Sequence, residues 1–235
     1  MVRLAAALIG SYLLGSIPAA YIAGRARGID LRQHGSGNLG ATNVIRVLGA
    51  RIGLLVFAFD MLKGALPAAL FPRWVSPDVM PMHDPLLFGI LCGVCAIMGH
   101  ARPIFLGLSK GGKGVATAAG VFLALAPLQT LLVLLVFGVV LWSSGYVSLG
   151  SLTSAAVLPV LLWLTVGARS PLFVISVLVA VFVFWTHRAN IQRLRSGQEH
   201  RFGKRGDAAT GTRPSPIVPI ALVVAFAIFI AARIG

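Results

Sequence analysis

The sequence predicts an all-α integral membrane protein, a polytopic bundle of helices that cross a bilayer. Hydrophobic residues make up 57% of the 235 residues, charged residues only 11%, and the mean hydropathy is +0.91. Soluble domains carry about 25% charged residues, so a water-soluble fold could not bury this much apolar surface. The same composition excludes intrinsic disorder and an ordinary cytosolic enzyme.

Apolar runs along the chain predict where the helices cross. A crossing helix needs about 20 mostly apolar residues. The run over residues 4–24 resembles the apolar part of a signal peptide, but it is long enough to span, and we expect it to remain as the first helix. The seven candidate runs are 4–24, 52–71, 86–105, 115–142, 147–166, 172–186 and 217–232.

The charge balance predicts which loops face the cytoplasm. The chain has 20 Lys and Arg against 6 Asp and Glu, a net charge of +14. In a soluble protein this excess would suggest a nucleic acid partner, but short cytoplasmic loops of membrane proteins retain basic residues, so we expect no nucleic acid and contacts with anionic lipid instead. The basic loops 25–51, 99–114 and 187–215 are therefore predicted to be cytoplasmic.

This assignment requires one run to cross twice or not at all. From the loop 99–114, three single crossings would leave 187–215 outside, against its basic residues. The run 115–142 is too long for one straight span, and Pro127 interrupts it. Two short halves around Pro127 would place residues 143–148 in the cytoplasm and give eight crossings, with both termini outside.

A first polar loop, residues 28–49, combines glycines with small polar side chains and leads into a helix expected near Val44. Successive N–H groups in glycine turns can converge on an anion. We expect Thr42 or Asn43 to cap the helix, and Arg46 to donate to phosphate. A flexible loop is the alternative, but we favour an anion cradle. Its other members are Gly35, Ser36, Gly37, Asn38 and Gly40.

A second polar loop, residues 99–117, is also rich in glycine and lysine. Its Gly107 and Gly112-Lys113 nearly match a Walker A motif, but Gly114 replaces the required Ser or Thr and no strand precedes it, which excludes an NTPase. What remains is a loop with Lys110, Gly111, Gly112 and Lys113 that opens a helix and suits phosphate. Two such loops suggest two phosphorylated ligands.

Other polar residues lie in or next to the predicted helices. Ser148 belongs to a hydroxyl-rich patch, and His187 and Asn190 share one helix face as candidate substrate contacts. Asp60 and Lys63 lie within an apolar run, where a functional role and a mutual ion pair remain equally open. We interpret the C-x-x-C cysteines in the run 86–98 as packing residues, not as a redox or metal site.

Together these motifs resemble the bacterial acyl-phosphate:glycerol-3-phosphate acyltransferases, the PlsY family, over residues 4–195. The matching segments are Gly15-Ser16-Ile17-Pro18, the block from Asp30 to Arg46, Gly99-His100 with Lys110 to Thr117, Tyr146 to Leu149, and His187-Arg188 with Asn190-Ile191. The chain departs from the pattern at Ser143-Ser144-Gly145, which lacks an arginine expected before Tyr146.

The resemblance implies transfer of a fatty acyl group from acyl phosphate to the 1-position of sn-glycerol 3-phosphate. The products would be lysophosphatidate and phosphate, in the first step of phospholipid synthesis, with no cofactor and no metal. It also implies a multi-pass protein of the bacterial inner membrane with cytoplasmic active-site loops. The implied partners are membrane lipids and the two substrates, and the soluble enzyme that makes acyl phosphate is a candidate partner.

The resemblance also assigns the site residues. Ser36, Arg46, Lys113 and His187 are the implied catalytic residues. The implied substrate-binding residues are Gly35, Gly37, Asn38, Gly40, Thr42, Asn43, Lys110, Gly111, Gly112, Ser148 and Asn190.

The predicted organisation is a seven-crossing acyltransferase core over 1–195, a basic linker over 196–216 and an additional transmembrane helix over 217–235. The main alternative is an organic-phosphate transporter, which would be expected to show paired repeats with polar groups near the membrane midplane. A phosphotransferase would need carboxylates for Mg²⁺, and only Asp30 is near the motifs.

Overall fold

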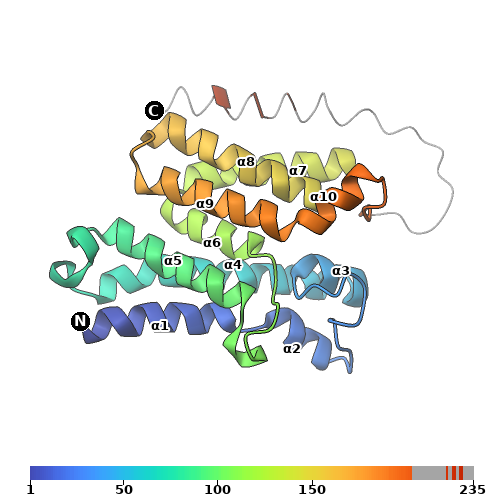
Figure 1. Cartoon of the computed structure of the whole chain (residues 1–235), viewed down its shortest axis with the longest axis horizontal. Coiled ribbons are helices and arrows are strands. Elements are labelled where there is room, and N and C mark those ends of the chain that lie inside the picture. Colours follow the sequence, from blue (N-terminus) through green and yellow to red (C-terminus); the bar gives the residue numbers. More distant parts are fainter. Residues whose placement is uncertain (203–220, 222–223, 226–227, 230–235) are drawn as a thin grey trace. The chain divides into compact units, whose positions relative to one another are not determined.

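The computed structural model describes residues 1–202, 221, 224–225 and 228–229, and within them it contains helices and loops but no strand. It divides into two compact units, Met1–Pro127 and Leu128–Gly235. The first unit contains α1 (Val2–Ser16), α2 (Ala19–Arg25), α3 (Ala41–Leu48), α4 (Ala50–Trp74), α5 (Pro85–Ala101) and α6 (Val115–Leu125). From its boundary the second continues with α7 (Pro127–Ser144), α8 (Val147–Val166), α9 (Pro171–Thr186) and α10 (Arg188–Arg195) (Figure 1).

Five of the described helical segments are long and apolar enough to cross a membrane. A sixth is possible if α9 and α10, which meet at a 60° bend, count as one span. The prediction of a polytopic all-α membrane protein is confirmed, whereas the count of seven core crossings stays a prediction. Most of the predicted last helix, 217–235, and of the linker before it lies outside the described residues.

The helices of the first unit pack closely because small residues lie where they cross. A Cβ atom on Gly15 of α1 would overlap the backbone of Ala96 in α5, and one on Gly64 of α4 would overlap the carbonyl of Thr117 in α6. Membrane helices approach one another through such small residues, since lipid gives them no hydrophobic drive to associate. Cys92, which is fully buried in α5, belongs to an apolar cluster of this unit and is a free thiol, as its packing role predicts.

Prolines break two of the predicted spans. Pro18 separates α1 from α2, and α6 ends at Leu125 just before α7 begins at Pro127. The predicted break at Pro127 is therefore confirmed. The expectation of two short halves is wrong for the second one: α6 has 11 residues, but α7 has 18 and is long enough to span alone. Proline forces such breaks because it lacks an N–H and clashes with the preceding turn.

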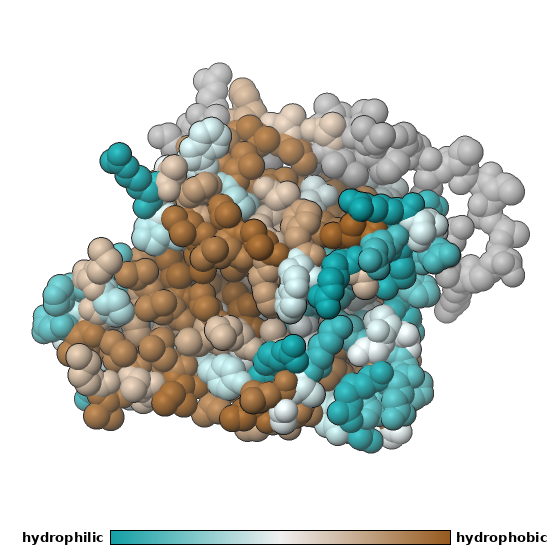
Figure 2. Space-filling model, in the orientation of Figure 1, coloured by the Kyte–Doolittle hydropathy of each residue, from teal (hydrophilic) through white to brown (hydrophobic). Residues whose placement is uncertain are grey.

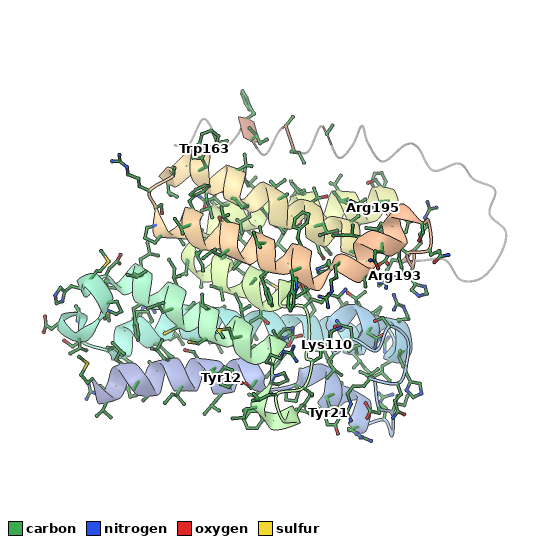
Figure 3. All side chains as sticks on the ribbon, in the orientation of Figure 1. Tyr12, Tyr21, Lys110, Trp163, Arg193 and Arg195 are labelled. Atoms are coloured by element: carbon green, nitrogen blue, oxygen red, sulfur yellow. The ribbon has the colours of Figure 1, made fainter. Side chains whose placement is uncertain are left out.

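The second unit is built on a hairpin of α7 and α8, with α9 packed against α8 (Figure 1). Its apolar core is Val133, Val136 and Val140 of α7 with Val157 and Leu161 of α8, and the side chains of Val224 and Ile228 pack against it. Arg193 and Arg195 lie at the end of this unit opposite Trp163 (Figure 3). Aromatic and basic residues of this kind are typical of the two membrane interfaces.

Large apolar side chains are exposed along the helix bodies. Leu54 and Leu55 of α4 are 59% and 72% exposed, and Val181 of α9 is 64% exposed. Figure 2 shows apolar residues over the bodies of the helices of the first unit and polar residues gathered at its α2–α3 end. Extended apolar surface of this kind is what a helix needs where it faces lipid.

Candidate active site

The first polar loop is organised by Asn43, which lies in α3 and is almost completely buried. Its amide nitrogen donates to the carbonyls of Leu31 (3.3 Å) and His34 (3.0 Å), and its Oδ1 accepts from the backbone N–H of Ser36 (2.8 Å). The prediction that Thr42 or Asn43 caps a helix beginning near Val44 is wrong. The helix begins at Ala41 after Gly40, without a side-chain cap, and Asn43 clamps the preceding loop instead.

Two glycines of this loop occupy positions where another residue would be strained. Gly35 and Gly37 have φ angles of +62° and +67°, in the left-handed region that other residues rarely adopt. A Cβ at Gly35 would also overlap the Oδ1 atom of Asn43. These turns leave Ser36 exposed at the surface, while the Oδ1 atom of Asn38 is buried without a hydrogen-bond partner among the described residues.

An ion-pair cluster holds the start of the same loop against α2. Asp30 accepts from Arg32 (2.6 Å) and Arg25 (3.2 Å), and both guanidinium groups lie 5.1 Å from the centre of the Tyr21 ring. Hydrogen bonds from the side chain and backbone of Arg32, together with the charges of Arg32 and Arg25, hold the pKa of Asp30 far below its usual range despite partial desolvation. The carboxylate of Asp30 is therefore engaged in ion pairs with both arginines.

The second polar loop is held at the end of α5 by backbone hydrogen bonds. The N–H groups of Gly111 and Gly112 donate to the carbonyls of Ala101 (3.0 Å) and His100 (3.2 Å). Gly114, with a φ of +81°, then leads into α6. The prediction that this loop opens a helix is confirmed. Carbonyl groups at the end of a helix have no partner within it, so they are available to fix such a loop.

The two polar loops meet in the first unit. A Cβ atom on Gly112 would lie only 3.0 Å from the carbonyl oxygen of Leu39, which follows Asn38 in the first loop. Lys110 is exposed and Lys113 is half-buried. The structure therefore brings together the glycine-rich segments that the sequence assigns to phosphate binding.

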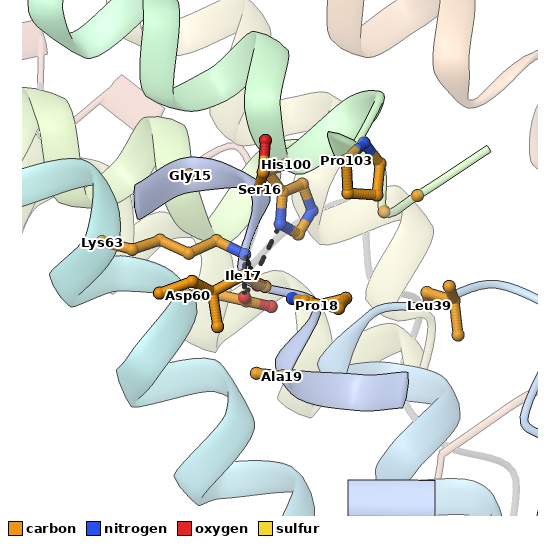
Figure 4. A pocket seen from close by; sticks show the side chains of 12 residues that line it. Gly15, Ser16, Ile17, Pro18, Ala19, Leu39, Asp60, Lys63, His100 and Pro103 are labelled. Atoms are coloured by element: carbon orange, nitrogen blue, oxygen red, sulfur yellow. Dashed lines mark hydrogen bonds and ion pairs between the residues drawn. The ribbon is translucent and has the colours of Figure 1, made fainter. Parts of the chain in front are cut away.

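A small pocket lies where these loops reach the helix ends (Figure 4). Leu39 comes from the first loop, Gly111 and Gly112 come from the second, and residues 15–19 form the break between α1 and α2. Its remaining lining residues are Pro103 and three buried polar ones, Asp60, Lys63 and His100.

The buried polar residues of this pocket form one charged cluster. Lys63 Nζ lies 2.7 Å from Asp60 Oδ1, and His100 Nδ1 lies 3.6 Å from the same oxygen. Lys63 also donates to the carbonyl of Ile17 (3.0 Å), at the break between α1 and α2. The ion pair considered for Asp60 and Lys63 is therefore present, and it faces the pocket lined by the second loop.

The second unit holds the remaining candidate residues. His187 is buried at the bend between α9 and α10, where its Nδ1 lies 2.8 Å from the carbonyl of Val183. Because a carbonyl oxygen can only accept, Nδ1 carries the proton in that contact. Asn190 is buried one turn later on α10, the helix that His187 precedes as its N-cap, and α9 and α10 meet there at a 60° bend.

Glu199 connects two of the candidate site residues, and the sequence alone does not reveal this. Its Oε1 accepts from Ser148 (2.9 Å) and Asn190 (2.6 Å), and its Oε2 accepts from Arg193 (2.7 Å). Burial raises the pKa of Glu199, but hydrogen bonds from Asn190, Arg193 and Ser148 and the charge of Arg193 outweigh it, so the pKa is lowered. The feature of the sequence that could have pointed to Glu199 is that it is a single carboxylate between basic residues.

The segment after α10 also contacts the loop between α7 and α8. Arg201 donates to the Tyr146 hydroxyl (2.9 Å), and the N–H of Phe202 donates to the carbonyl of Gly145 (2.7 Å). Residues 196–202, the first part of the predicted linker, thus carry specific contacts.

Arg188, at the start of α10, makes only local contacts among those described. Its guanidinium group stacks at 5.0 Å on the Trp185 ring, three residues earlier in the chain.

The first unit has membrane-spanning helices, a charged cluster buried between them, and glycine-rich loops at their ends. These features are those of a polytopic membrane protein with a polar site at the ends of its helices. The family model described as glycerol-3-phosphate acyltransferase matches residues 5–197. The chain belongs to the glycerol-3-phosphate acyltransferase family, and it is an acyltransferase of lipid biosynthesis. This assignment gives no support to the alternative of an organic-phosphate transporter.

Curated relatives and solved structures agree with the family model. The glycerol-3-phosphate acyltransferase of Geobacter metallireducens is 48% identical over 195 residues, 83% of this chain and 95% of the relative. That of Trichlorobacter lovleyi is 45% identical over 196 residues, with the same coverage. The crystal structure of PlsY (YgiH), an integral membrane glycerol 3-phosphate acyltransferase in its glycerol 3-phosphate form, is 39% identical, covers 85% of this chain and 96% of its own, and has a TM-score of 0.75. Its lysophosphatidic acid form is 38% identical, covers 85% of this chain and 95% of its own, and gives 0.72.

Proposed function

We propose that the protein transfers a fatty acyl group from acyl phosphate to the 1-hydroxyl of sn-glycerol 3-phosphate, giving lysophosphatidate and phosphate. The observation that carries this proposal is the meeting of two glycine-rich loops at Leu39 and Gly112, because both substrates carry a phosphate. The forms in which a relative was crystallised, with glycerol 3-phosphate and with lysophosphatidic acid, agree with this substrate and product.

The reaction needs little acid–base chemistry from the protein. The 1-hydroxyl oxygen attacks the carbonyl carbon of the acyl phosphate, the bond from that carbon to the phosphate oxygen breaks, and phosphate leaves. The hydroxyl proton passes to His187 or to a substrate phosphate. Because a mixed anhydride has a good leaving group, positioning and stabilisation of negative charge can supply most of the catalysis.

Residues of the polar motifs are assigned to the acyl-phosphate head. They are Ser36, Asn38, Thr42, Lys113 and Ser148. The buried Oδ1 of Asn38 accepts hydrogen bonds only, whereas its amide nitrogen can donate to phosphate. Asn43 is a positioning residue in this proposal, because its amide is committed to the loop at both ends.

Glycerol 3-phosphate is assigned to Arg46, Lys110, His187 and Asn190. Arg46 is exposed on α3 and can donate two parallel hydrogen bonds to a phosphate. His187 is assigned to the hydroxyl group, because a histidine can take a proton near neutral pH. Asn190 shares its amide with Glu199, so the carboxylate orients it.

The proposed setting is the bacterial inner membrane, with the loops at the cytoplasmic face. The acyl chain then stays in lipid while both phosphates approach from water. Acyl phosphate is supplied in this proposal by a soluble enzyme, and the reaction uses no cofactor and no metal.

The test is turnover by the purified full chain in detergent. We expect release of phosphate and formation of lysophosphatidate from acyl phosphate and glycerol 3-phosphate, and little or no product when acyl-CoA is the donor. Mass spectrometry of the product identifies the acylated position. Efficient turnover with acyl-CoA, and none with acyl phosphate, would contradict the proposed donor.

A further inference from the structure

The proposed reaction leaves one set of buried ionisable side chains without a role. Asp60 and Lys63 of α4 and His100 of α5 have side chains exposed by only 3%, 2% and 6%. They form the charged cluster drawn in Figure 4, with Asp60 between the other two. Buried charges are expensive in a membrane helix and default to a functional hypothesis.

The cluster reaches the second polar loop through His100. The backbone carbonyl of His100 accepts from the N–H of Gly112 (3.2 Å), and its imidazole lies so close to Gly112 that any Cβ there would overlap Nε2. The loop is therefore held by the backbone carbonyl of His100, and the glycine at 112 lets it lie directly against the imidazole ring. A change in ring orientation would displace Gly112 and, with it, the adjacent Lys113.

The other two residues fix that ring. Asp60 Oδ1 faces His100 Nδ1, and the Asp60 carboxylate is itself held by Lys63 at 2.7 Å. Lys63 is anchored to the carbonyl of Ile17, which connects the cluster to the break between α1 and α2. Helix α4 thus contributes two side chains, α5 contributes the ring, and the break after α1 contributes a carbonyl.

Stability alone is a weak reason for this arrangement. Replacing a buried ion pair by apolar residues of similar volume is often neutral or stabilising, because desolvation offsets the attraction between the charges. An apolar pair would, however, leave the ring of His100 without the oriented carboxylate that faces Nδ1. The arrangement therefore favours a role in geometry.

We propose that Asp60 and Lys63 act through His100 as positioning residues that hold the loop from Gly111 to Lys113 in its phosphate-binding conformation. None of the three touches substrate in this inference. It rests on the proposed function, since it assigns the loop to a substrate phosphate. It adds to that function a set of side chains, buried in the helix bundle, that support the loop.

The main test is the charge-neutral double variant Asp60→Asn/Lys63→Met in the full chain. Because both charges are removed together, no unpaired ion is left in the bundle, and we expect the thermal unfolding midpoint to stay within a few degrees of wild type. We expect kcat/KM for acyl phosphate and glycerol 3-phosphate to fall at least 10-fold. Wild-type kinetics in the folded double variant would overturn the proposal.

A double-mutant cycle with Lys113→Ala separates positioning from a general structural effect. If the cluster acts through the loop, its removal adds at most about 3-fold to the loss already caused by Lys113→Ala. A cluster that supports the fold in general would multiply the two losses. Multiplied losses would therefore overturn the proposal.

Variants of His100 test the same point if the double variant does not fold. We expect His100→Ala to lose at least 10-fold in kcat/KM, and His100→Gln, which keeps an N–H in a similar volume, to recover part of that loss. Equal activity of both variants and wild type would contradict the proposal. Ser176→Ala in α9 is the control: it removes a buried hydroxyl that donates to the carbonyl of Phe173 and should leave kcat/KM unchanged.

A binding measurement distinguishes this inference from the proposed reaction. Trypsin cleavage after Lys110 and Lys113 reports the state of the loop, and glycerol 3-phosphate should slow cleavage in wild type but not in Asp60→Asn/Lys63→Met. Protection lost in the variant supports the positioning role even if acyl phosphate is not the donor. Equal protection in both proteins would overturn the positioning role, whatever the donor.

Discussion

The polar loops of the first unit and the Glu199 cluster of the second unit are both anchored, but by different means. In the first unit, glycines and the amide of Asn43 fix the chain within a dozen residues, so the pattern is visible in the sequence. In the second unit, one carboxylate joins Ser148 and Asn190, and Ser148 and Glu199 are 51 positions apart in the sequence. The first arrangement is a local backbone property, and the second depends on the fold.

The comparison depends first on which side of the membrane each region faces. Thiol labelling of single cysteines tests this, and each cysteine is expected either to react or not to react. With Cys92 and Cys95 replaced, we expect Ser109→Cys and Ser143→Cys to resist an impermeant thiol reagent added to intact cells, because positive charge places both loops in the cytoplasm. Ser76→Cys, in a nearly neutral connection, should react. Labelling of the cysteine at 143 from outside would refute the predicted turn after Pro127.

The largest graded effect is expected at the charged residues of the polar loops. Arg46→Ala and Lys113→Ala should each lower kcat/KM at least ~100-fold, about 2.7 kcal/mol of transition-state stabilisation, because each is assigned to a phosphate. Arg188→Ala is the matched control, since its guanidinium stacks on Trp185, and it should lose far less. Similar losses in all three folded variants would remove the distinction between site charges and topology charges.

Backbone control of the first loop predicts a smaller loss at Gly35. Gly35→Ala combines left-handed strain of about 1–2 kcal/mol with overlap between its Cβ and the Asn43 amide, so we expect kcat/KM about 10-fold lower. Gly138→Ala, in α7 with open space around it, should have wild-type activity. Steady-state kinetics of the two variants decide the point, and full activity of Gly35→Ala would contradict the backbone argument.

Side-chain control of the second region predicts a loss of stability at Glu199. Glu199→Gln weakens hydrogen bonds to charged and polar partners, worth about 2 kcal/mol, so the thermal unfolding midpoint in detergent should fall by about 5 °C. Gln198→Ala, at an exposed neighbour, should leave the midpoint unchanged. Equal midpoints for Glu199→Gln and wild type would mean that the carboxylate does not anchor this segment.

The same carboxylate predicts a pH dependence. The pKa of Glu199 is lowered in the folded protein by its hydrogen bonds, which outweigh desolvation. Its stabilising contribution is therefore fully present above the ordinary value of 4.5 and is lost as the pH falls through the lowered folded value. The gap in unfolding midpoint between wild type and Glu199→Gln should shrink as the pH falls below 4.5, and a constant gap would contradict this assignment.

The smallest expected effect is that of metal removal. EDTA should leave turnover unchanged, because among residues 1–202 and the few described beyond them no three His, Cys, Asp or Glu side chains form a group that could hold a metal ion. Loss of turnover with EDTA, and its recovery with a divalent cation, would show that the phosphates need a metal as well as the basic loops.

Sequence and structure agree where short-range chemistry decides the outcome. Composition gives the membrane class, Pro127 gives the helix break, and the glycine-rich segment around Gly112 gives the loop that opens α6. The start of α3 was not predictable, because the amide of Asn43 bonds backward to the loop, a choice set by tertiary packing. Glu199 could not be found either, since neither spacing nor periodicity connects it to Ser148.

The spacing of Asp60 and Lys63 has a consequence for how α4 enters the bilayer. A single charge at the centre of a helix costs about 2.5–3.5 kcal/mol on insertion. These two lie one turn apart, at i and i+3, so they neutralise each other on one isolated helix before any partner helix has arrived. Helix α4 thus carries its own counterion, and His100 of α5 and the carbonyl of Ile17, after α1, complete the cluster in the folded unit.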